Sequence, residues 1–368
     1  MAISALRRAA PLELAADAPV ALQGSLQGSP QGTVQGSLQA SVQSSALLHW
    51  STAEVDPKDR FDYWRTVRAN GLFGATTELA QEQRLLFCGE LALRKFGSAG
   101  LIKLRASPHY VERGPADIAK AQGDSLCIYQ QRGGGSRFWV GDFGDFSIAN
   151  GHFATGHSDL PYHSIPLAQD GFDFRVLKVP VADISVAIAG LPDLAAKPFG
   201  DHPVLMPLLE SCFCDLTEAA DDIDPATAKA TVQTVSQLAL IARGLVQPRS
   251  RIAQRAIRAG RLSLARRLIA NCLAQPQLSP SYVANLIGIS VRHLHVLFEE
   301  ASLSFAQTVT ALRIERSRRL LCEAPAMTIA ETALASGFDS IATYYRVFRA
   351  NQGITPGDFR DKMIRTTA

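Results

Sequence analysis

The feature that most constrains this chain is a short motif that occurs twice in its C-terminal third. Residues 283–290 read VANLIGIS and residues 332–339 read TALASGFD, so each copy has alanine, three residues, glycine, an apolar residue and a small polar one. A small residue lets two helices approach closely, and glycine just past a helix end adopts the left-handed backbone that other residues resist. Ser290, and either Asp339 or Ser340 in the second copy, would cap the following helix. We therefore predict two helix-turn-helix units.

Helix-start signals flank both copies of the motif. Ser279-Pro280 places a cap before proline in the first turn, and Thr328-x-x-Glu331 forms a capping box. Between the copies, residues 304–321 predict a longer helix that separates the two units by a fixed distance. Beyond the second copy, residues 353–360 predict a turn, a Thr355 cap and a packing aromatic residue. A helical bundle with ordinary glycine turns is the alternative, which the repetition of the motif disfavours.

The charge of the chain is divided between two unlike parts. Residues 248–368 hold 17 Lys and Arg against 8 Asp and Glu, a formal charge of +9, whereas residues 1–247 hold 20 against 26, a charge of −6. Sixteen of the 17 cations are arginine, whose forked guanidinium suits phosphate groups and guanine edges. The C-terminal third is therefore expected to bind a polyanion.

These residues together resemble the DNA-binding domain of the AraC/XylS family of bacterial transcription regulators. The resemblance rests on Ala284, Gly288, Ser290, Leu294, Phe298, Arg313 and Leu320-Leu321, then on Ala333, Gly337-Phe338, residues 346–349, residues 353–356 and Phe359-Arg360. It implies that each recognition helix enters a major groove and that the connecting helix holds the two about one turn, or ~34 Å, apart. The sequence departs from the family pattern at Val296, Ser317 and Thr332.

The resemblance also implies which residues contact DNA. Carried over by position, they are Ser290, Arg292, His293, His295, Arg313, Ser340, Ile341, Ala342, Thr343, Tyr345 and Arg346. Arg346 is the first candidate for reading a base and Arg292 the second, because Ile341 and Ala342 can contact a thymine methyl but cannot donate hydrogen bonds from their side chains. The alternative for either arginine is a solvated surface side chain.

The middle of the chain has a different sequence pattern, that of short strands. Short strand-like runs occupy residues 87–93, 101–104, 126–129, 137–140, 146–149 and 172–179, and indicate a small β-barrel or sandwich. Gly133-Gly134-Gly135 is a plausible hairpin connection, and residues 61–64 predict the start of an amphipathic helix. This region also resembles the cupin-like sensory domain of one branch of the family, at residues 61–64, Gly151 and residues 159–162.

The expected fold class is α+β, with a cupin-like β-barrel followed by an all-helical domain that holds both helix-turn-helix units. We predict a disordered low-complexity tail over residues 1–48, an effector-binding domain over 49–190, a helical region over 191–247 and a DNA-binding domain over 248–368. Two amphipathic helices in the 191–247 region could complete the β-domain's core or form a dimer contact; the sequence leaves both open.

The expected function is that of a cytoplasmic, DNA-binding transcription regulator, an effector-responsive activator that acts as a homodimer with RNA polymerase. Tyr129 and Trp139 are candidate effector contacts because they are aromatic residues on predicted strands. One alternative is a β-domain that serves only dimerisation. We expect no membrane span, since no apolar run approaches the roughly 20 residues needed, and no secretory signal.

A metal-dependent enzyme is the other alternative. His152, His157 and His163 lie close in sequence, with His109 a possible neighbour, but the region lacks the His-x-His pair typical of metal-binding cupins. The six cysteines follow no metal-binding spacing and read as reduced thiols. We therefore expect no catalytic residue, no metal and no cofactor.

Overall fold

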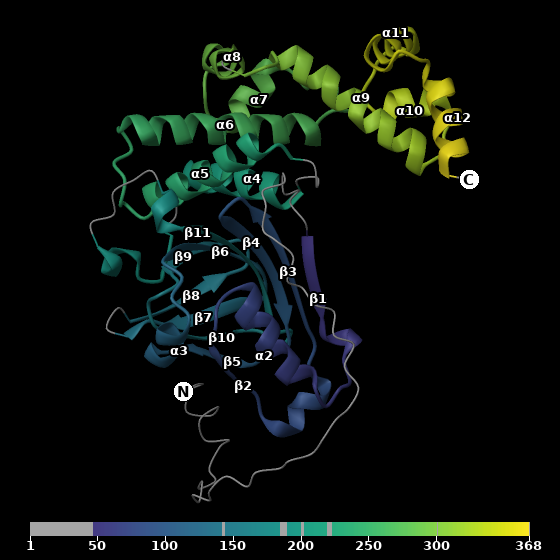
Figure 1. Cartoon of the computed structure of the whole chain (residues 1–368). Coiled ribbons are helices and arrows are strands. Elements are labelled where there is room, and N and C mark those ends of the chain that lie inside the picture. The colour runs from purple at the N-terminus through teal and green to yellow at the C-terminus, as the bar shows by residue number, and fades with distance from the viewer. Residues whose placement is uncertain are drawn as a thin grey trace, which may run out of the picture. The chain divides into compact units, whose positions relative to one another are not determined.

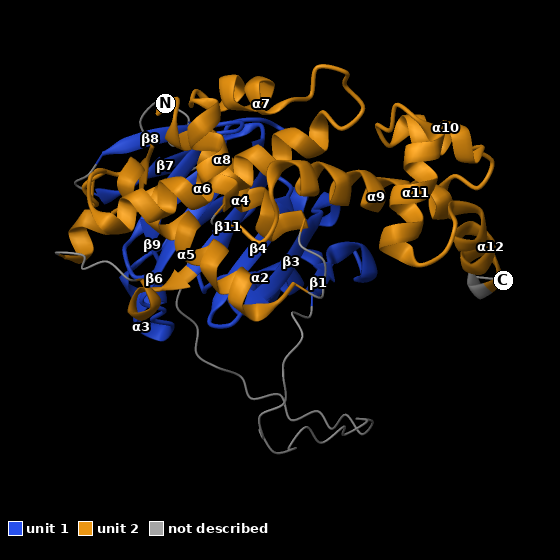
Figure 2. Cartoon of the chain, turned by 90° about the horizontal axis from the view of Figure 1, so that it is seen from above, with its two compact units in different colours: residues 1–178 blue, residues 179–368 orange. Residues whose placement is uncertain are grey.

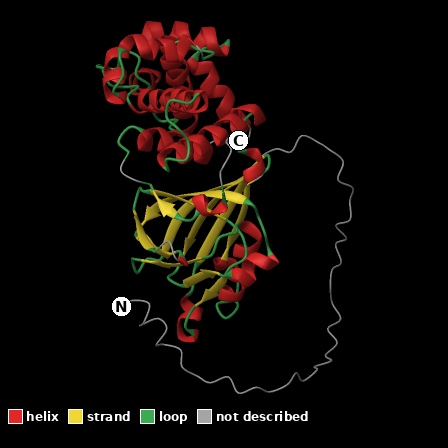
Figure 3. Cartoon of the chain, turned by 90° about the vertical axis from the view of Figure 1, so that its left-hand side faces the viewer, coloured by secondary structure: helices red, strands yellow, loops and turns green. Residues whose placement is uncertain are grey.

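The computed structural model describes residues 47–141, 144–184, 190–199, 202–218, 223–299 and 301–367 (Figure 1). The chain divides into two compact units, residues 1–178 and 179–368 (Figure 2). Strands dominate the first unit and helices the second (Figure 3), which confirms the predicted α+β class. Of the predicted tail, residues 1–46 lie outside the described residues, while Leu47 and Leu48 begin the first strand.

The first unit consists of strands with a few short helices. Its elements are β1 (Leu47–Ser51), η1 (Thr52–Glu54), α2 (Arg60–Gly71), β2 (Thr76–Glu78), η2 (Gln81–Leu86), β3 (Gly89–Phe96), β4 (Ala99–Ala106), β5 (Tyr110–Arg113), α3 (Pro115–Lys120), β6 (Ser125–Gly133), β7 (Gly135–Trp139), β8 (Asp145–Ala149), β9 (Phe153–His157), β10 (Tyr162–Pro166) and β11 (Phe172–Pro180). The strand-like runs predicted from the sequence all fall on or beside these strands.

These strands form two antiparallel sheets. One sheet has the order β1-β3-β4-β11-β6-β9, and the other β2-β5-β10-β7-β8. The inner faces meet through aromatic side chains, for example Tyr129 of the first sheet and Phe138 of the second, whose ring centroids lie 6.0 Å apart. Alternation of side chains across each strand supplies one apolar face per sheet, so the core forms between them.

The triple glycine does not form the predicted hairpin. β6 ends at Gly133 and β7 begins at Gly135, but β6 pairs with β9 whereas β7 pairs with β8 and β10. The glycines therefore carry the chain from one sheet to the other. Gly134, with φ +59°, supplies the left-handed residue that this change of direction requires.

Helix α2 confirms the prediction of an amphipathic helix starting at residues 61–64. Its apolar face buries Phe61, Trp64 and Val67, each 4% exposed or less. Phe61 and Trp64 pack against Phe87, at centroid distances of 5.2 and 5.8 Å. This spacing of three residues places the rings on one side of the helix.

The second unit is almost wholly helical. After η4 (Val181–Asp183), η5 (Leu191–Leu194) and β12 (Lys197–Pro198) come α4 (Leu205–Glu218), α5 (Pro225–Ala242), α6 (Arg251–Asn271), α7 (Pro280–Ile287), α8 (Val291–Glu299), α9 (Phe305–Glu323), α10 (Ile329–Ala335), α11 (Ile341–Gln352) and α12 (Pro356–Thr367). The two helices expected between residues 191 and 247 are α4 and α5.

Two separate apolar cores organise helices α6 to α12. The first joins Ala265 and Ile269 of α6 to Ala284 of α7, Phe298 of α8 and Phe305 of α9. The second contains Ile314 and Leu321 of α9 with Ala333, Phe338, Tyr344, Phe348 and Phe359. Helix α9 contributes to both cores, so it is the element that connects them.

Candidate DNA-binding site

The first helix-turn-helix has the local structure that its sequence predicts. Ser279 caps α7 by accepting a hydrogen bond from the backbone N–H of Tyr282, and Pro280 occupies the first turn. The helix ends at Gly288 with φ +73°, in the left-handed region. Ser290 then accepts from the backbone N–H of His293 at 3.1 Å and starts α8. These caps satisfy backbone groups at the ends of both helices.

The second helix-turn-helix repeats this arrangement with a longer turn. Thr328 and Glu331 form the predicted capping box at the start of α10. Gly337 follows the helix with φ +93°. Of the two candidate caps for α11, the structure uses Ser340, whose hydroxyl accepts from the backbone N–H of Thr343 at 3.4 Å. Counted from the glycine to the capping serine, the second turn is one residue longer than the first, and Ser290 corresponds to Ser340.

One face of each recognition helix is buried and the other is exposed. Leu294 and Phe298 anchor α8, and the corresponding Tyr344 and Phe348 anchor α11; all four are at most 2% exposed. Exposed side chains among the predicted DNA contacts are Ser290, Arg292, His295, Ser340, Ile341, Ala342, Thr343, Tyr345 and Arg346, while His293 is half-buried. The structure therefore gathers these predicted contacts on two outward faces.

Helix α9 connects the two helix-turn-helix units. Its N-terminus carries a capping box in which Ser304 and Gln307 exchange hydrogen bonds. Phe305 packs in the first core, and Leu321 in the second. Figure 1 shows α8 and α11 near opposite ends of α9 and on the same side of it, both viewed close to end-on.

Arg313 of α9 lies inside the domain rather than on either outward face. Its guanidinium is half-buried, donates to the backbone carbonyl of Leu273 at 3.2 Å and lies 5.8 Å from the ring centroid of Phe338. Burial lowers the pKa of Arg313, against the opposing effect of Asp339. Leu273 follows α6, and Phe338 lies in the turn between α10 and α11. Arg313 therefore connects the part of the domain around the first helix-turn-helix to the part around the second. The sequence predicts Arg313 as a DNA contact, and the structure places its guanidinium against Leu273 and Phe338.

Sequence reasoning missed a buried hydrogen bond in the second core. The hydroxyls of Ser317 and Tyr344 lie 2.6 Å apart, and neither residue is exposed to solvent. Ser317 is one of the departures from the family pattern, and in this structure its hydroxyl is paired with that of Tyr344. A polar residue on the buried face of α9 was the available signal, since a buried hydroxyl needs a partner.

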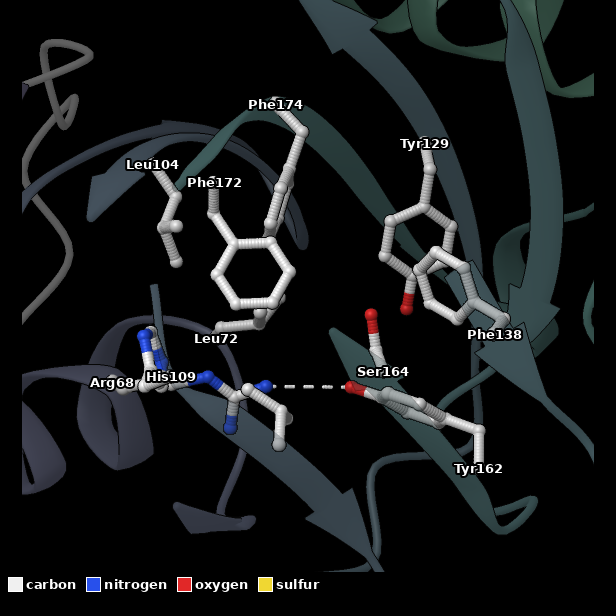
Figure 4. Close-up of a pocket in the computed structure, with 11 residues that line it drawn as sticks. Arg68, Leu72, Leu104, His109, Tyr129, Phe138, Tyr162, Ser164, Phe172 and Phe174 are labelled. Atoms are coloured by element: carbon white, nitrogen blue, oxygen red, sulfur yellow. Dashed lines mark hydrogen bonds between the residues drawn. The ribbon is translucent and has the colours of Figure 1, made fainter. Parts of the chain in front are cut away.

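The first unit contains a pocket between its two sheets (Figure 4). The cavity is about 20 Å³, and its walls are rich in aromatic side chains, namely Tyr129, Phe138, Tyr162, Phe172 and Phe174. Tyr129, a predicted effector contact, is therefore part of it. Trp139 is not among the residues that line the pocket; its ring lies beside Arg137, 5.2 Å from the guanidinium. Successive residues of a strand point to opposite faces, which is why Phe138 enters the pocket and Trp139 does not.

The histidines of the first unit are not grouped. His109 is buried among aromatic rings, His157 lies 3.3 Å from Asp124, and His163 lies 3.6 Å from Glu112. Within the described ranges, no three His, Cys, Asp or Glu residues come together as metal ligands would. In the same part of the chain, every helix is too short or too polar to cross a bilayer.

Comparisons with known proteins agree with this geometry. Residues 283–362 match the family model described as a helix-turn-helix domain. The chain is 23% identical to the transcriptional activator NphR of a Rhodococcus species over 335 residues, which cover 87% of this chain and 94% of that protein. It is 39% identical to the HTH-type transcriptional regulator GlxA of Rhizobium meliloti over 79 residues, which cover 21% of this chain and 24% of that protein. Among solved structures, the AraC-like transcriptional activator CuxR matches with a TM-score of 0.48 and 20% identity, over 79% of this chain and all of that one.

Proposed function

We propose that this chain, whose C-terminal domain is similar to those of the AraC/XylS family of DNA-binding transcription regulators, reads two successive major-groove segments with α8 and α11. The observation that carries this proposal is the pair of capped recognition helices with exposed polar faces, mounted on the single helix α9. The net charge of +9 over residues 248–368 supports the attraction to phosphate. The capping hydroxyls of Ser290 and Ser340 stand at the helix N-termini, where a DNA phosphate would be favoured.

The two helices are proposed to contribute unequally to base recognition. Alignment through the caps pairs Arg346 of α11 with Val296 of α8, and Ala342 with Arg292. Each helix thus has an arginine at only one of these two positions. Arg346 stands in the second turn beside the exposed Tyr345, and Arg292 in the first turn of α8. A bidentate contact from either guanidinium to guanine would discriminate by about 1–3 kcal/mol against a wrong base.

The remaining functions are assigned to other parts of the chain. We propose that the first unit, which we interpret as a cupin-like sensor, binds a small effector in its aromatic pocket. Helices α4 and α5 group with the second unit, and we propose that they also form the homodimer contact. Activation through RNA polymerase in the cytoplasm is the expected output, as the similarity to transcriptional activators supports.

The test is to select the preferred DNA site with the full-length protein and then to measure binding by fluorescence anisotropy. Arg346→Ala is expected to cost about 1–3 kcal/mol on that site and to relax the preference at one base position. Arg105→Ala is the matched control, because Arg105 is an exposed arginine of the first unit and its loss should leave binding unchanged. Unaltered affinity of Arg346→Ala across a library of sites would remove this assignment.

A further inference from the structure

A buried arginine without an acidic partner lines the pocket of the first unit. Arg68 of α2 is 4% exposed and donates from Nη2 to the hydroxyl of Tyr162 at 3.4 Å. Its Nη1 is buried and has no hydrogen-bond partner. No Asp or Glu lies among the residues that line the pocket, and none forms an ion pair with Arg68 within the described residues. A buried guanidinium in this condition has one neutral acceptor, the Tyr162 hydroxyl, but lacks the anionic acceptor that would offset its desolvation.

A second buried arginine of the same unit, Arg113, has a structural role and serves as a comparison. Arg113 is fully buried and donates to the backbone carbonyls of Gly74, Ala121 and Ser158. It also lies 3.7 Å from the carboxylate of Asp159. Its donors are directed to acceptors supplied by the chain itself. For the Nη1 of Arg68, by contrast, the described part of the chain supplies no acceptor.

Hydroxyl groups line the pocket beside Arg68, and they can donate a hydrogen bond to a ligand. The hydroxyl of Ser164 is buried and also has no hydrogen-bond partner. The hydroxyls of Tyr129, Tyr162 and Ser164 point to the same part of the pocket as the guanidinium (Figure 4). Burial raises the pKa of both tyrosines, so their hydroxyls keep their protons. This polar end of the pocket is suited to an anion.

The rest of the pocket is apolar. Leu104, Phe172 and Phe174 lie together on one side of it, while Phe138 lies beside Tyr129 and Leu72 beside Arg68 (Figure 4). An inorganic anion would gain nothing from these side chains, whereas an organic acid would bury its hydrocarbon body against them. The pocket thus combines one cation with a wall of flat rings.

We propose that the effector is a small organic carboxylate with a flat apolar body, and that its carboxylate binds the Nη1 of Arg68 and the hydroxyl of Ser164. This inference rests on the proposed function, in which the first unit senses a small molecule. The cavity of about 20 Å³ has room for about one water, so the ligand's body must displace aromatic side chains. The ligand would therefore bind a rearranged first unit more tightly than this one, and such a difference in affinity is the condition for a ligand to shift an equilibrium between two states.

The experiment uses the full-length protein with two probe acids, benzoate and phenylacetate, and their uncharged amides, benzamide and phenylacetamide. We expect millimolar concentrations of an acid to raise the unfolding temperature, since a ligand that binds only the folded state stabilises it, and the amides to have no effect. Arg68→Met keeps the length of the side chain and removes its charge, and is expected to weaken binding of the acid at least tenfold. Arg105→Met is the control, because Arg105 is 74% exposed in its side chain and pairs with Asp173 at 3.6 Å.

A second measurement guards against a variant that merely fails to fold. Without any ligand, Arg68→Met should unfold at or above the wild-type temperature, because it removes an unpaired buried charge, whereas Arg113→Met should unfold well below it. Ser164→Ala, which leaves the guanidinium in place, should weaken the acid less than Arg68→Met.

The outcomes separate this inference from the proposed function. Equal binding of acids and amides, equal binding to Arg68→Met, or no binding of either acid overturns the carboxylate assignment, while the DNA-binding assay still stands on its own. Binding of an acid that depends on Arg68 but does not alter DNA affinity supports the carboxylate site and refutes effector control.

Discussion

The two motif glycines occupy equivalent places in the sequence but different surroundings in the structure. Gly288 has φ +73°, and a Cβ added there would have no atom within 4 Å. Gly337 has φ +93°, and an added Cβ would lie 2.0 Å from the backbone carbonyl oxygen of Leu273. That carbonyl also accepts the hydrogen bond of Arg313. Alanine is therefore expected to be tolerated at one glycine and not at the other.

The magnitudes follow from these distances. Gly288→Ala forces a Cβ into the left-handed region, which costs about 1–2 kcal/mol. Gly337→Ala adds a clash with a backbone atom that a change of side-chain rotamer cannot relieve. The chain must separate Gly337 from Leu273, which disturbs the hydrogen bond and the packing of Arg313. We expect a loss of more than ~4 kcal/mol, in the range reserved for severe disruption.

Hydrogen exchange of the full-length variants, followed by mass spectrometry of peptides, measures these losses locally. Since about 1.4 kcal/mol is a factor of ten, Gly288→Ala should speed exchange in α7 and α8 roughly tenfold. Gly337→Ala should speed exchange in α10 and α11 by about a thousandfold or more. The three tryptophans, Trp50, Trp64 and Trp139, all lie in the first unit, so their fluorescence serves as a control that should not change. Equal effects of the two substitutions would refute the reasoning.

Two further predictions concern buried polar groups. Ser317→Ala leaves the Tyr344 hydroxyl buried without a partner and should cost about 1–3 kcal/mol, measured as faster exchange in α11; adding Tyr344→Phe should recover most of it, and no recovery would contradict the bond. Burial lowers the pKa of His109 from 6.5 to about 4. The unfolded chain therefore binds the proton more readily than the folded one, and the free energy of unfolding should fall by about 3 kcal/mol as the pH drops from 6.5 to 4. Trp64 donates to the Nε2 of His109 at 3.4 Å, so the fluorescence of Trp64 should report the transition. His109→Gln should flatten the pH dependence of stability, and an unchanged profile would exclude His109 as its source.

The sequence determined the helix-turn-helix units because their signals are local. A cap such as Ser279, a capping box such as Thr328 with Glu331, and a left-handed glycine each act over three or four residues. Such signals are readable without knowing the fold. The residues buried under each recognition helix follow from the same helical spacing.

The features that sequence reasoning missed depend on contacts between distant segments. Arg313 meets Leu273 across 40 residues of chain, and no local pattern distinguishes it from the exposed arginines of the same helix. The pairing of strands around Gly134 depends on both sheets, so a glycine run that is typical of a hairpin became a crossover. The unpaired guanidinium of Arg68 likewise becomes visible only when the pocket around it is assembled.

Helix α6 packs against helices α4 and α5 of the 191–247 region and also contributes to the core of the first helix-turn-helix. Toward its middle, Gly260 lets α6 approach α4 and α5, since a Cβ there would lie 3.0 Å from Leu208 and 3.1 Å from Leu238. Ser263 donates to Asp215 of α4 at 2.6 Å. One or two turns further on, Ala265 and Ile269 enter the core beneath α8. Because α6 is continuous through these contacts, we expect a shift of α4 or α5 to be felt first by the helix-turn-helix of α7 and α8, and by that of α10 and α11 only through Leu273 at the end of α6 and through α9.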